Sequence, residues 1–530
     1  MKSLRKMRIH AAVAAACLAL GGGLTLSTAH ATPTLSTTNT GQALVFPYYT
    51  VNNGWITTFN VTNTSDLTVA VKVPFHEKKN TRDVLDFNVV LSPYDVWTAY
   101  VQDTDFGPQL LTGDQSCTSP QVVSGAIASN IAYTGQFNDT GGSGFQRMRD
   151  GYVEMLVMGV ADAGEEDNMD NVVAYNAKHV DGVPRDCAAV DKAFVAKAPT
   201  WVGPSLPTDA RYNVQVDCDG DGTPETTPDA GNGSPEAWCD FRAPSNGENP
   251  LKGNIAWLQI GTGAGAGGEA ISVADWSTLN LVTAQQFPWF LEPTFPSPGK
   301  GLWTVDGAYL DNFEGQIAAL STFNEWANNP SNGAAIDWAV VFPTKAFHVD
   351  KFNQQIQAAV SRYRNAGADV VSCTNDSAAA RGTCTDLGAP TTVDPFEYLF
   401  GVQGNGDSII TVEYALFDRE EGTTTIETDG TTISPAPPPD IVIETLRYEA
   451  NVIQFADASV LGSTSPTIVD AGGLLGTTTG WAKLSFIGSQ GEGLPVAAFA
   501  VKARTQGEAS SNYGQAIENG YERPVPATVP

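Results

Sequence analysis

Short apolar, β-branched and aromatic runs alternate with turn-forming residues along the first hundred residues of the chain. The turn-rich breaks contain Asn, Gly, Ser, Pro and Lys. In one run Val69, Val71 and Val73 alternate with Ala70 and Lys72, a period of two that places the valines on one face of a strand. Short strands at this spacing predict an antiparallel β-sandwich. The runs cover residues 43–46, 55–61, 68–73, 85–91 and 95–101.

Strand signals continue through the rest of the chain, and helices are plausible mainly within residues 276–330, notably around 310–320. The proline-rich run 434–439 cannot sit in a central strand, so a stiff connector or exposed loop is expected there. The fold class expected is mainly β, with two sandwich-like (Ig-like) domains, long disulfide-bearing loop insertions and a minor helical segment. The later strands are expected at residues 151–159, 254–260, 270–273, 337–342, 408–417, 441–455, 481–487 and 495–501.

A chain of 530 residues has room for more than one domain. We expect a signal peptide at 1–31, an N-terminal β-sandwich domain at 32–275 and a C-terminal β-rich domain at 276–530. The polar, acidic region of about 160–250 has a composition that cannot form a core unaided. We therefore expect it to be an insertion at the edge of the first sandwich.

The first 31 residues have the three parts of a secretory signal peptide. Four basic residues precede an apolar run at 10–20, and Ala29 and Ala31 form an A-x-A cleavage site. The apolar run is too short to span a bilayer, and no later stretch reaches 18 unbroken apolar residues. Cys17, after three alanines, leaves a lipoprotein anchor as an alternative. The expected location is outside the cytoplasm, whether cell surface, extracellular medium or periplasm.

Without those 31 residues the chain has 58 acidic and 25 basic residues, a formal net charge of −33. This balance excludes the basic face that nucleic-acid binding needs, and it argues against attraction to anionic lipid. Hydrophobic residues at 42% argue against wholesale disorder.

Six cysteines remain after Cys17, and an even number in an exported chain predicts disulfides. Proximity in the sequence favours Cys218–Cys239 and Cys373–Cys384, which leaves Cys117–Cys187. Fifteen pairings are possible in principle, and free buried thiols are the alternative. No two cysteines have the CxxC spacing of a zinc site.

The local motif that points to a ligand is an aspartate loop. Asp217, Asp219 and Asp221 occupy alternate positions, followed by Gly222 and then Glu225. Carboxylates spaced in this way match the start of a Ca²⁺-binding loop, because an oxygen-preferring cation must neutralise them. Position twelve is a proline and no helix is expected beside the loop, so the match is incomplete. A structural Ca²⁺ is expected here, and the alternative is a solvated acidic turn.

Catalytic motifs are weak. Residues 263–268 fit G-x-G-x-x-G by letter, but a strand rather than a helix is expected after them, which favours a hairpin over a dinucleotide site. There is no G-x-S-x-G motif, and His76 beside Glu77 is an isolated pair. Glu325 and Asp337, each next to a tryptophan, are conceivable glycosidase carboxylates. A chain this acidic produces such neighbours by chance, so no catalytic residue is assigned.

Seven segments resemble a family of uncharacterised exported cell-surface proteins from proteobacteria. The resemblance implies an exported or cell-surface location and transfers no catalytic residue. The segments are residues 43–51, 84–99, 151–159, 337–345, 417–421, 448–455 and 493–499.

The composition is similar to that of bacterial surface-layer proteins, with a pI near 4.4 and few Met and His residues. That similarity implies self-association in which Ca²⁺ bridges carboxylates that would otherwise repel. The expected function is a non-enzymatic structural or interaction protein of the cell surface, calcium-stabilised and self-assembling, with cell-envelope components as further partners. The alternative is a secreted or periplasmic binding protein for carbohydrate or another ligand, and a carbohydrate-active hydrolase is a weaker alternative.

Overall fold

Strands and antiparallel sheets dominate the structure, a computed structural model that confirms the mainly β fold class. Two sandwich-like halves make up the part described, and their Ig-like character stays a prediction. The described residues are 34–122, 125–134, 138–162, 172–195, 241–242, 244–276, 313–350, 394–401, 406–419, 442–487, 493–505 and 512–524.

The first half is two sheets packed face to face. Phe59 on the six-stranded sheet contacts Phe46 and Phe75 on the seven-stranded sheet, with edge-to-face rings 5.6 and 5.4 Å apart. The seven-stranded sheet has the order β1 (Thr34–Leu35), β15 (Ile271–Ala274), β2 (Ala43–Thr50), β10 (Asp150–Asp162), β4 (Leu67–Glu77), β5 (Asp83–Leu91) and β8 (Cys117–Ser119). The six-stranded sheet has the order β14 (Ala264–Glu269), β13 (Leu251–Gln259), β3 (Trp55–Asn63), β6 (Val96–Thr104), β7 (Gly107–Leu111) and β9 (Ala126–Ile127).

The second half is a ten-stranded sheet that folds over at the hairpin between β17 and β18. These two strands pair only near their turn, at Asn328 and Asn329, and then diverge into two layers. Trp326 of one layer and Trp338 of the other both contact Phe455 in a shared core. One layer contains β20 (Val442–Leu446), β19 (Ile410–Asp418), β23 (Thr479–Phe486), β17 (Ser321–Asn329) and β27 (Gly520–Glu522). The other contains β26 (Tyr513–Glu518), β25 (Ala497–Arg504), β18 (Ala334–Val341), β21 (Ala450–Gln454) and β22 (Thr467–Ile468). The short strands β16 (Ala318–Ala319) and β24 (Leu494–Pro495) pair separately.

Helices are short. The helices α1 (Val172–Ala177) and α2 (Cys187–Val195) flank a small hairpin of β11 (His179–Val180) and β12 (Val183–Pro184). Cys187 at the start of α2 is bonded to Cys117 in β8, with an S–S distance of 2.05 Å. In the second half, α5 (Lys345–Val349) follows β18, and α8 (Ala471–Leu475) begins where the Asp470 carboxylate accepts from the Gly473 amide. The 3₁₀ turns η1 (Asn52–Gly54), η2 (Ile131–Tyr133) and η4 (Phe145–Met148) complete the first half.

Most of the predicted strands that fall within the described residues are present. The helical prediction for residues 276–330 is only partly confirmed. Residues 313–317 are helical, but Ser321–Asn329, inside the segment where helices were expected, is the strand β17. The helices α1 and α2 lie in the predicted insertion. They bury Val173, Ala174 and Phe194 in the core of the first half, so these two helices pack on that core. Within the described residues, no helix has the length and apolarity to cross a membrane.

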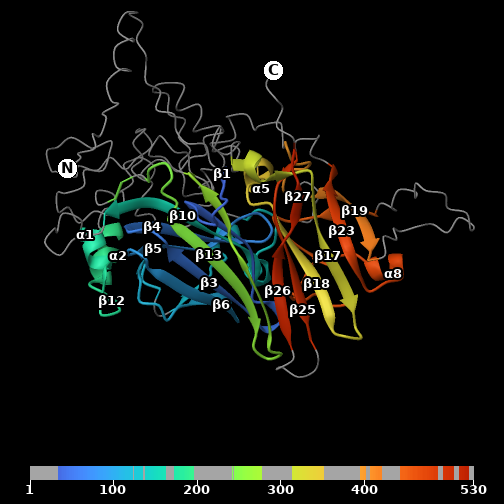
Figure 1. The fold of residues 1–530 in the computed structure, drawn as a ribbon, viewed down its shortest axis with the longest axis horizontal. Helices are drawn as coiled ribbons and strands as arrows, with labels where there is room; N and C mark the ends of the chain where they lie inside the picture. Colours follow the sequence, from blue (N-terminus) through green and yellow to red (C-terminus); the bar gives the residue numbers. More distant parts are fainter. Residues whose placement is uncertain are drawn as a thin grey trace, which may run out of the picture.

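The two halves meet along a pair of edge strands. Figure 1 shows the strands of residues 34–276, in blue to green, beside those of residues 313–524, in yellow to red. Strand β14 lies against β26, and glycines allow the close approach. A Cβ at Gly514 would collide with the carbonyl oxygen of Gly265, and a Cβ at Gly268 would lie 3.3 Å from the Ala516 methyl group. The glycine-rich run is therefore half of a hairpin with β13, as predicted, and it also forms part of the contact between the halves.

Candidate functional site

One face of the seven-stranded sheet carries charged residues in the interior. The structure confirms the alternation predicted for β4. Val69, Val71 and Val73 lie on one face of the strand. Lys72 and His76 lie on the opposite face. Alternating apolar and polar residues usually indicate a strand with one side in solvent. In β4 both sides are buried, including the side that carries Lys72 and His76. The charges on it must therefore be paired internally.

The ion pairs on this face have short distances between their nitrogen and oxygen atoms. Lys72 Nζ lies 2.6 Å from Asp86, and His76 Nδ1 lies 2.5 Å from Asp83. Burial lowers the pKa of His76, but Asp83 and Glu154 outweigh it and raise that pKa to about 10, so the imidazole is charged at neutral pH. Burial raises the pKa of Asp86 to about 7 in spite of Lys72. A protonated imidazole held between carboxylates is a structural cation rather than a general base.

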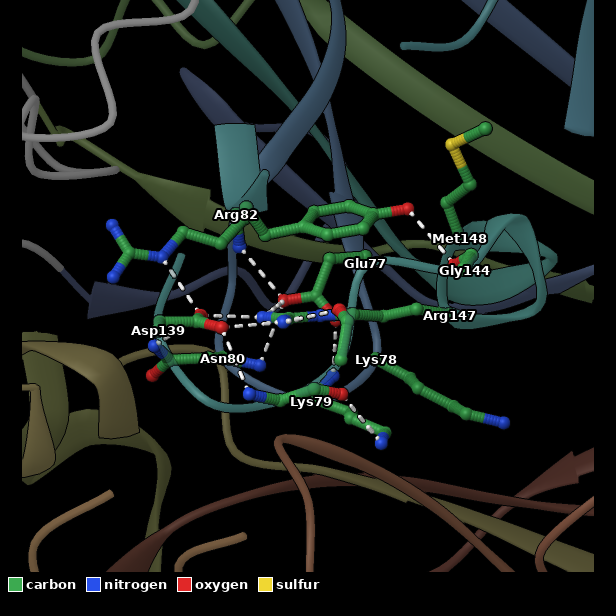
Figure 2. Close-up of polar contacts among 12 residues, drawn as sticks. Glu77, Lys78, Lys79, Asn80, Arg82, Asp139, Gly144, Arg147 and Met148 are labelled. Atoms are coloured by element: carbon green, nitrogen blue, oxygen red, sulfur yellow. Dashed lines mark hydrogen bonds and ion pairs between the residues drawn. The ribbon is translucent and has the colours of Figure 1, made fainter. Parts of the chain in front are cut away.

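A second buried cluster, the junction network, consists of Glu77, Arg82, Asp139, Arg147 and Asp350. Figure 2 shows the Arg147 guanidinium reaching between Glu77 and Asp139. Arg147 donates to Glu77 from Nε and Nη2 at 2.6 and 2.8 Å, and to Asp139 from Nη1 and Nη2 at 2.6 Å each. Arg82 donates to Asp139 at 3.2 Å and lies 2.7 Å from Asp350. Two bidentate pairs on one guanidinium fix its orientation completely.

The junction network connects the halves. Glu77 and Arg82 flank the β4–β5 turn, Arg147 belongs to η4, and Asp350 ends α5 in the second half. Burial would raise the pKa of Asp139, but Arg147 and Arg82 hold that pKa well below its ordinary value. Asp139 is therefore ionised, and both carboxylates that face Arg147 are engaged in ion pairs with it. This arrangement holds two parts of the chain together and provides no free acid or base for catalysis.

A buried lysine on α5 is bonded within the second half, next to a further contact from the first half. Lys345 Nζ donates to the carbonyl oxygens of Ser408 and Tyr448, and burial lowers the pKa of Lys345 to about 8. Burial likewise raises the pKa of Glu449 to about 8. From the first half, the Tyr152 hydroxyl donates to the Pro343 carbonyl at 3.1 Å. These contacts also serve packing rather than ligand binding.

The outer face of the β19–β23–β17 layer differs from these interior clusters because it presents large aromatic side chains to solvent. In β23, Ala482, Leu484 and Phe486 are buried, and the alternate positions face outward. One of those outward residues is Trp481, with 42% of its surface exposed, and its neighbour across the layer, Phe323 of β17, is 41% exposed. Exposed aromatic residues gathered at one place on a sheet favour a binding surface.

We call this surface the aromatic platform and define it by Phe323, Asn324, Glu325, Trp481, Glu518 and Gly520, which line a pocket of about 320 Å³. The volume is at the lower end of the range for small-molecule sites, roughly 300–1,000 Å³. Gly520 leaves room for an aromatic ring, since a Cβ there would collide with Phe323.

The pairing of the strands sets the geometry of the platform. Trp481 lies between Glu325 of β17 and Phe417 of β19 in the antiparallel register. The rings of Trp481 and Phe417 stack face to face, with centroids 3.9 Å apart and an interplanar angle of 8°. Because Phe417 covers the indole from the β19 side, the other indole face is turned toward β17 and the pocket.

Polar residues line the pocket together with Trp481. Glu325 lies 3.1 Å from Lys502, which leaves its carboxylate with further acceptor capacity. Asn324 is fixed by donating from Nδ2 to Asn519 Oδ1 at 2.8 Å. Partial burial raises the pKa of Glu518. A flat apolar ring with hydrogen-bond acceptors beside it can hold a small, partly polar ligand.

The sequence-predicted site residues have different outcomes. The Cys117–Cys187 disulfide is present in the structure. Among the described residues, no group of three His, Cys, Asp or Glu side chains could hold a metal ion. The residues predicted to bind calcium and the other predicted disulfide cysteines lie outside the described residues: Asp217, Asp219, Asp221, Glu225, Cys218, Cys239, Cys373 and Cys384.

The two conceivable glycosidase carboxylates are not brought together as a catalytic pair. Glu325 lines the pocket, whereas Asp337 is fully buried and accepts from Ser459 Oγ at 2.6 Å and the Leu461 amide at 2.9 Å. Burial raises the pKa of Asp337 to about 7. His76 and Glu77 also separate, because His76 pairs with Asp83 and Glu77 with Arg147.

Sequence reasoning missed Trp481, Phe323 and Glu518 as site residues. The available signal was a tryptophan on the polar side of an alternating strand, at Trp481 before Ala482 and Lys483. Which residues of β17 and β26 meet that tryptophan depends on strand order, which the sequence does not show. Comparison of the chain with protein-family models, curated proteins and solved structures gives no match.

Proposed function

We propose that this chain is an exported, non-enzymatic interaction protein of the bacterial cell surface, and that the aromatic platform is its binding surface. The observation that carries the proposal is the exposure of Trp481 and Phe323 around a pocket of about 320 Å³. Large aromatic side chains usually lie in the core or in an interface, and here other side chains of the same strands already supply the core.

The interior clusters support a scaffold role for the rest of the chain. The junction network commits its carboxylates and guanidiniums to one another and connects the two halves. A framework fixed in this way presents a surface without needing to move. The signal-like first 31 residues and the acidic composition supply the expectation of export, and self-association with Ca²⁺ remains a separate proposal, tested below.

The experiment is fractionation of cells that produce the chain, followed by binding of the purified mature protein to isolated cell envelopes. We expect the amino terminus of the exported protein to be Thr32, and we expect the protein to sediment with the envelopes. A Trp481→Ala variant should sediment less, and a Tyr94→Ala variant, which removes an aromatic side chain exposed by 67% in the other half, should behave as the parent. A chain recovered in the cytoplasm, or equal sedimentation of both variants, would contradict the proposal.

A further inference from the structure

The free indole face of Trp481 is the feature of the platform that points to a class of ligand. It is flat, it is turned toward β17, and it is fixed from behind by Phe417 at 3.9 Å. A ring held in one orientation costs little further entropy when a ligand covers it. Ligands that match such a surface are flat and present polarised C–H groups, because the face of an aromatic ring carries negative charge.

The two carboxylates that line the pocket with the ring accept hydrogen bonds. Each carboxylate of Glu325 and Glu518 offers several lone pairs, and an accepting carboxylate requires a ligand rich in hydroxyl or N–H donors. Hydrogen bonds to charged acceptors are about twice as strong as those between neutral groups. The pocket therefore combines one stacking surface with acceptors at its rim.

The charge of the site excludes an anion and weakens the case for a cation. Two carboxylates at the rim and a formal net charge of −29 for the chain repel anionic ligands. Glu325 is already paired with Lys502 at 3.1 Å, which removes much of the attraction for a second cation. A neutral ligand rich in hydroxyl groups fits this balance better than a charged one.

We infer that the aromatic platform binds a neutral pyranose unit of a polysaccharide, with Trp481 beneath the C–H face of the sugar and Glu325 and Glu518 accepting from its hydroxyl groups. This inference rests on the proposed function and names the ligand class of the same surface. Phe323, 41% exposed at the other side of the pocket, bounds the site and contacts an adjoining sugar.

The test is isothermal titration calorimetry of the mature protein with three neutral hexasaccharides, which are cellohexaose, chitohexaose and maltohexaose. Hexagalacturonate serves as the anionic probe and hexalysine as the cationic probe. We expect at least one neutral probe to bind and the anionic probe to bind much more weakly. Trp481→Ala should lower the affinity for the neutral probe tenfold or more, which corresponds to about 1.4 kcal/mol of binding free energy.

Two further variants keep the test independent of folding. Trp481→Phe keeps an aromatic face and should keep part of the affinity, whereas Tyr94→Ala should leave the affinity unchanged. The melting temperature of each variant is compared with that of the parent. A Trp481→Ala protein that melts as the parent and still binds the sugar as the parent overturns the inference.

The outcomes separate the inference from the proposed function. Envelope binding that needs Trp481, with no binding of any of the three neutral hexasaccharides, overturns the ligand class and keeps the interaction role. Binding of hexalysine in place of sugar, lost in Trp481→Ala, identifies a basic peptide as the ligand and also overturns the inference. Sugar binding without envelope binding supports the ligand class and contradicts the cell-surface role.

Discussion

Arg147 holds Glu77 by both oxygens of its carboxylate, at 2.6 and 2.8 Å, in a site from which solvent is excluded. The same guanidinium also binds Asp139, so one side chain compensates two buried negative charges. Because burying an uncompensated charge is expensive, this residue has more influence on stability than its number of contacts alone suggests.

Replacement of Arg147 by Met should therefore lower the free energy of unfolding strongly, by about 3–5 kcal/mol, because it leaves two carboxylates unpaired in the interior. Urea unfolding measures the change. The matched control is Lys252→Met, which breaks a largely exposed pair with Glu269 at 3.1 Å and should cost about 1 kcal/mol or less. Equal losses in the two variants would show that the junction network does not stabilise the fold.

Asp337 should make stability depend on pH. Its pKa is raised from 3.8 to about 7 by burial, so the folded state keeps a proton that the unfolded state has already released. The protonated Asp337 therefore adds to the free energy of unfolding below pH 3.8. This stabilisation, on the order of 1–4 kcal/mol, is lost as the pH rises toward 7.

An Asp337→Asn variant mimics the protonated acid and keeps an acceptor for Ser459 and Leu461. Relative to the parent, it should gain stability steadily between pH 4 and pH 7 and then level off. Unfolding curves at several pH values for both proteins give the difference. A difference that stays constant across this window rules out Asp337 as the titrating group.

The Cys117–Cys187 disulfide should stabilise the first half. It closes a loop across a sequence separation of 70 residues, and loops of this size gain roughly 2–5 kcal/mol from a disulfide. The Cys117→Ser/Cys187→Ser variant should lose that amount in oxidising buffer. In reducing buffer the parent should approach the variant, and failure to do so would mean that the loss has another cause.

Gly514 should be intolerant of a side chain. A Cβ there would collide with backbone oxygen atoms of Gly265 and Lys502, neither of which is a flexible side-chain end. Gly514→Ala should therefore cost roughly 1–3 kcal/mol, as overpacking does elsewhere. Gly261→Ala is the matched control, because a Cβ at Gly261 meets nothing within 4 Å. Comparable unfolding midpoints for the two variants would argue against the close contact between β14 and β26.

Calcium should stabilise the chain if the aspartate loop binds it. A ligand at 100 times its dissociation constant adds about 2.7 kcal/mol, worth roughly 5–10 °C in Tm for a domain of 150–250 residues. Millimolar Ca²⁺ should give this shift, with a smaller response in an Asp219→Ala/Asp221→Ala variant and with Mg²⁺. Light scattering on the same samples measures self-association. If NaCl at matched ionic strength reproduces the shift, general screening explains it.

Alternation in the sequence was enough to predict the β class and the position of strands such as β4 and β23, because side chains of a strand face opposite sides. It did not show that the polar face of β4 is buried. Lys72 and His76 lie in the interior because each pairs with a carboxylate of the neighbouring strand β5. Pairing of this kind depends on register, which local patterns do not specify.

The binding surface was predictable only in fragments. Glu325 stood out because a tryptophan follows it, but its partner in the structure is Trp481, which is 156 positions away and comes alongside through the pairing of β17 with β23. Strand Ser321–Asn329 lies in the segment where helices were thought plausible, and no strand pairing with β23 was expected for it. The order of strands within a sheet brought these residues together.

The contact between β14 and β26 has a consequence for biosynthesis. Each is an edge strand of its own sheet, and an uncovered edge exposes unpaired amide and carbonyl groups that recruit strands from other molecules. In the complete chain each edge shields the other. A polypeptide ending near residue 275 would keep β14 and lose its cover, so it should aggregate during folding. Each half thus covers the edge strand of the other half. Both edges are covered only after the second half has been synthesised and folded.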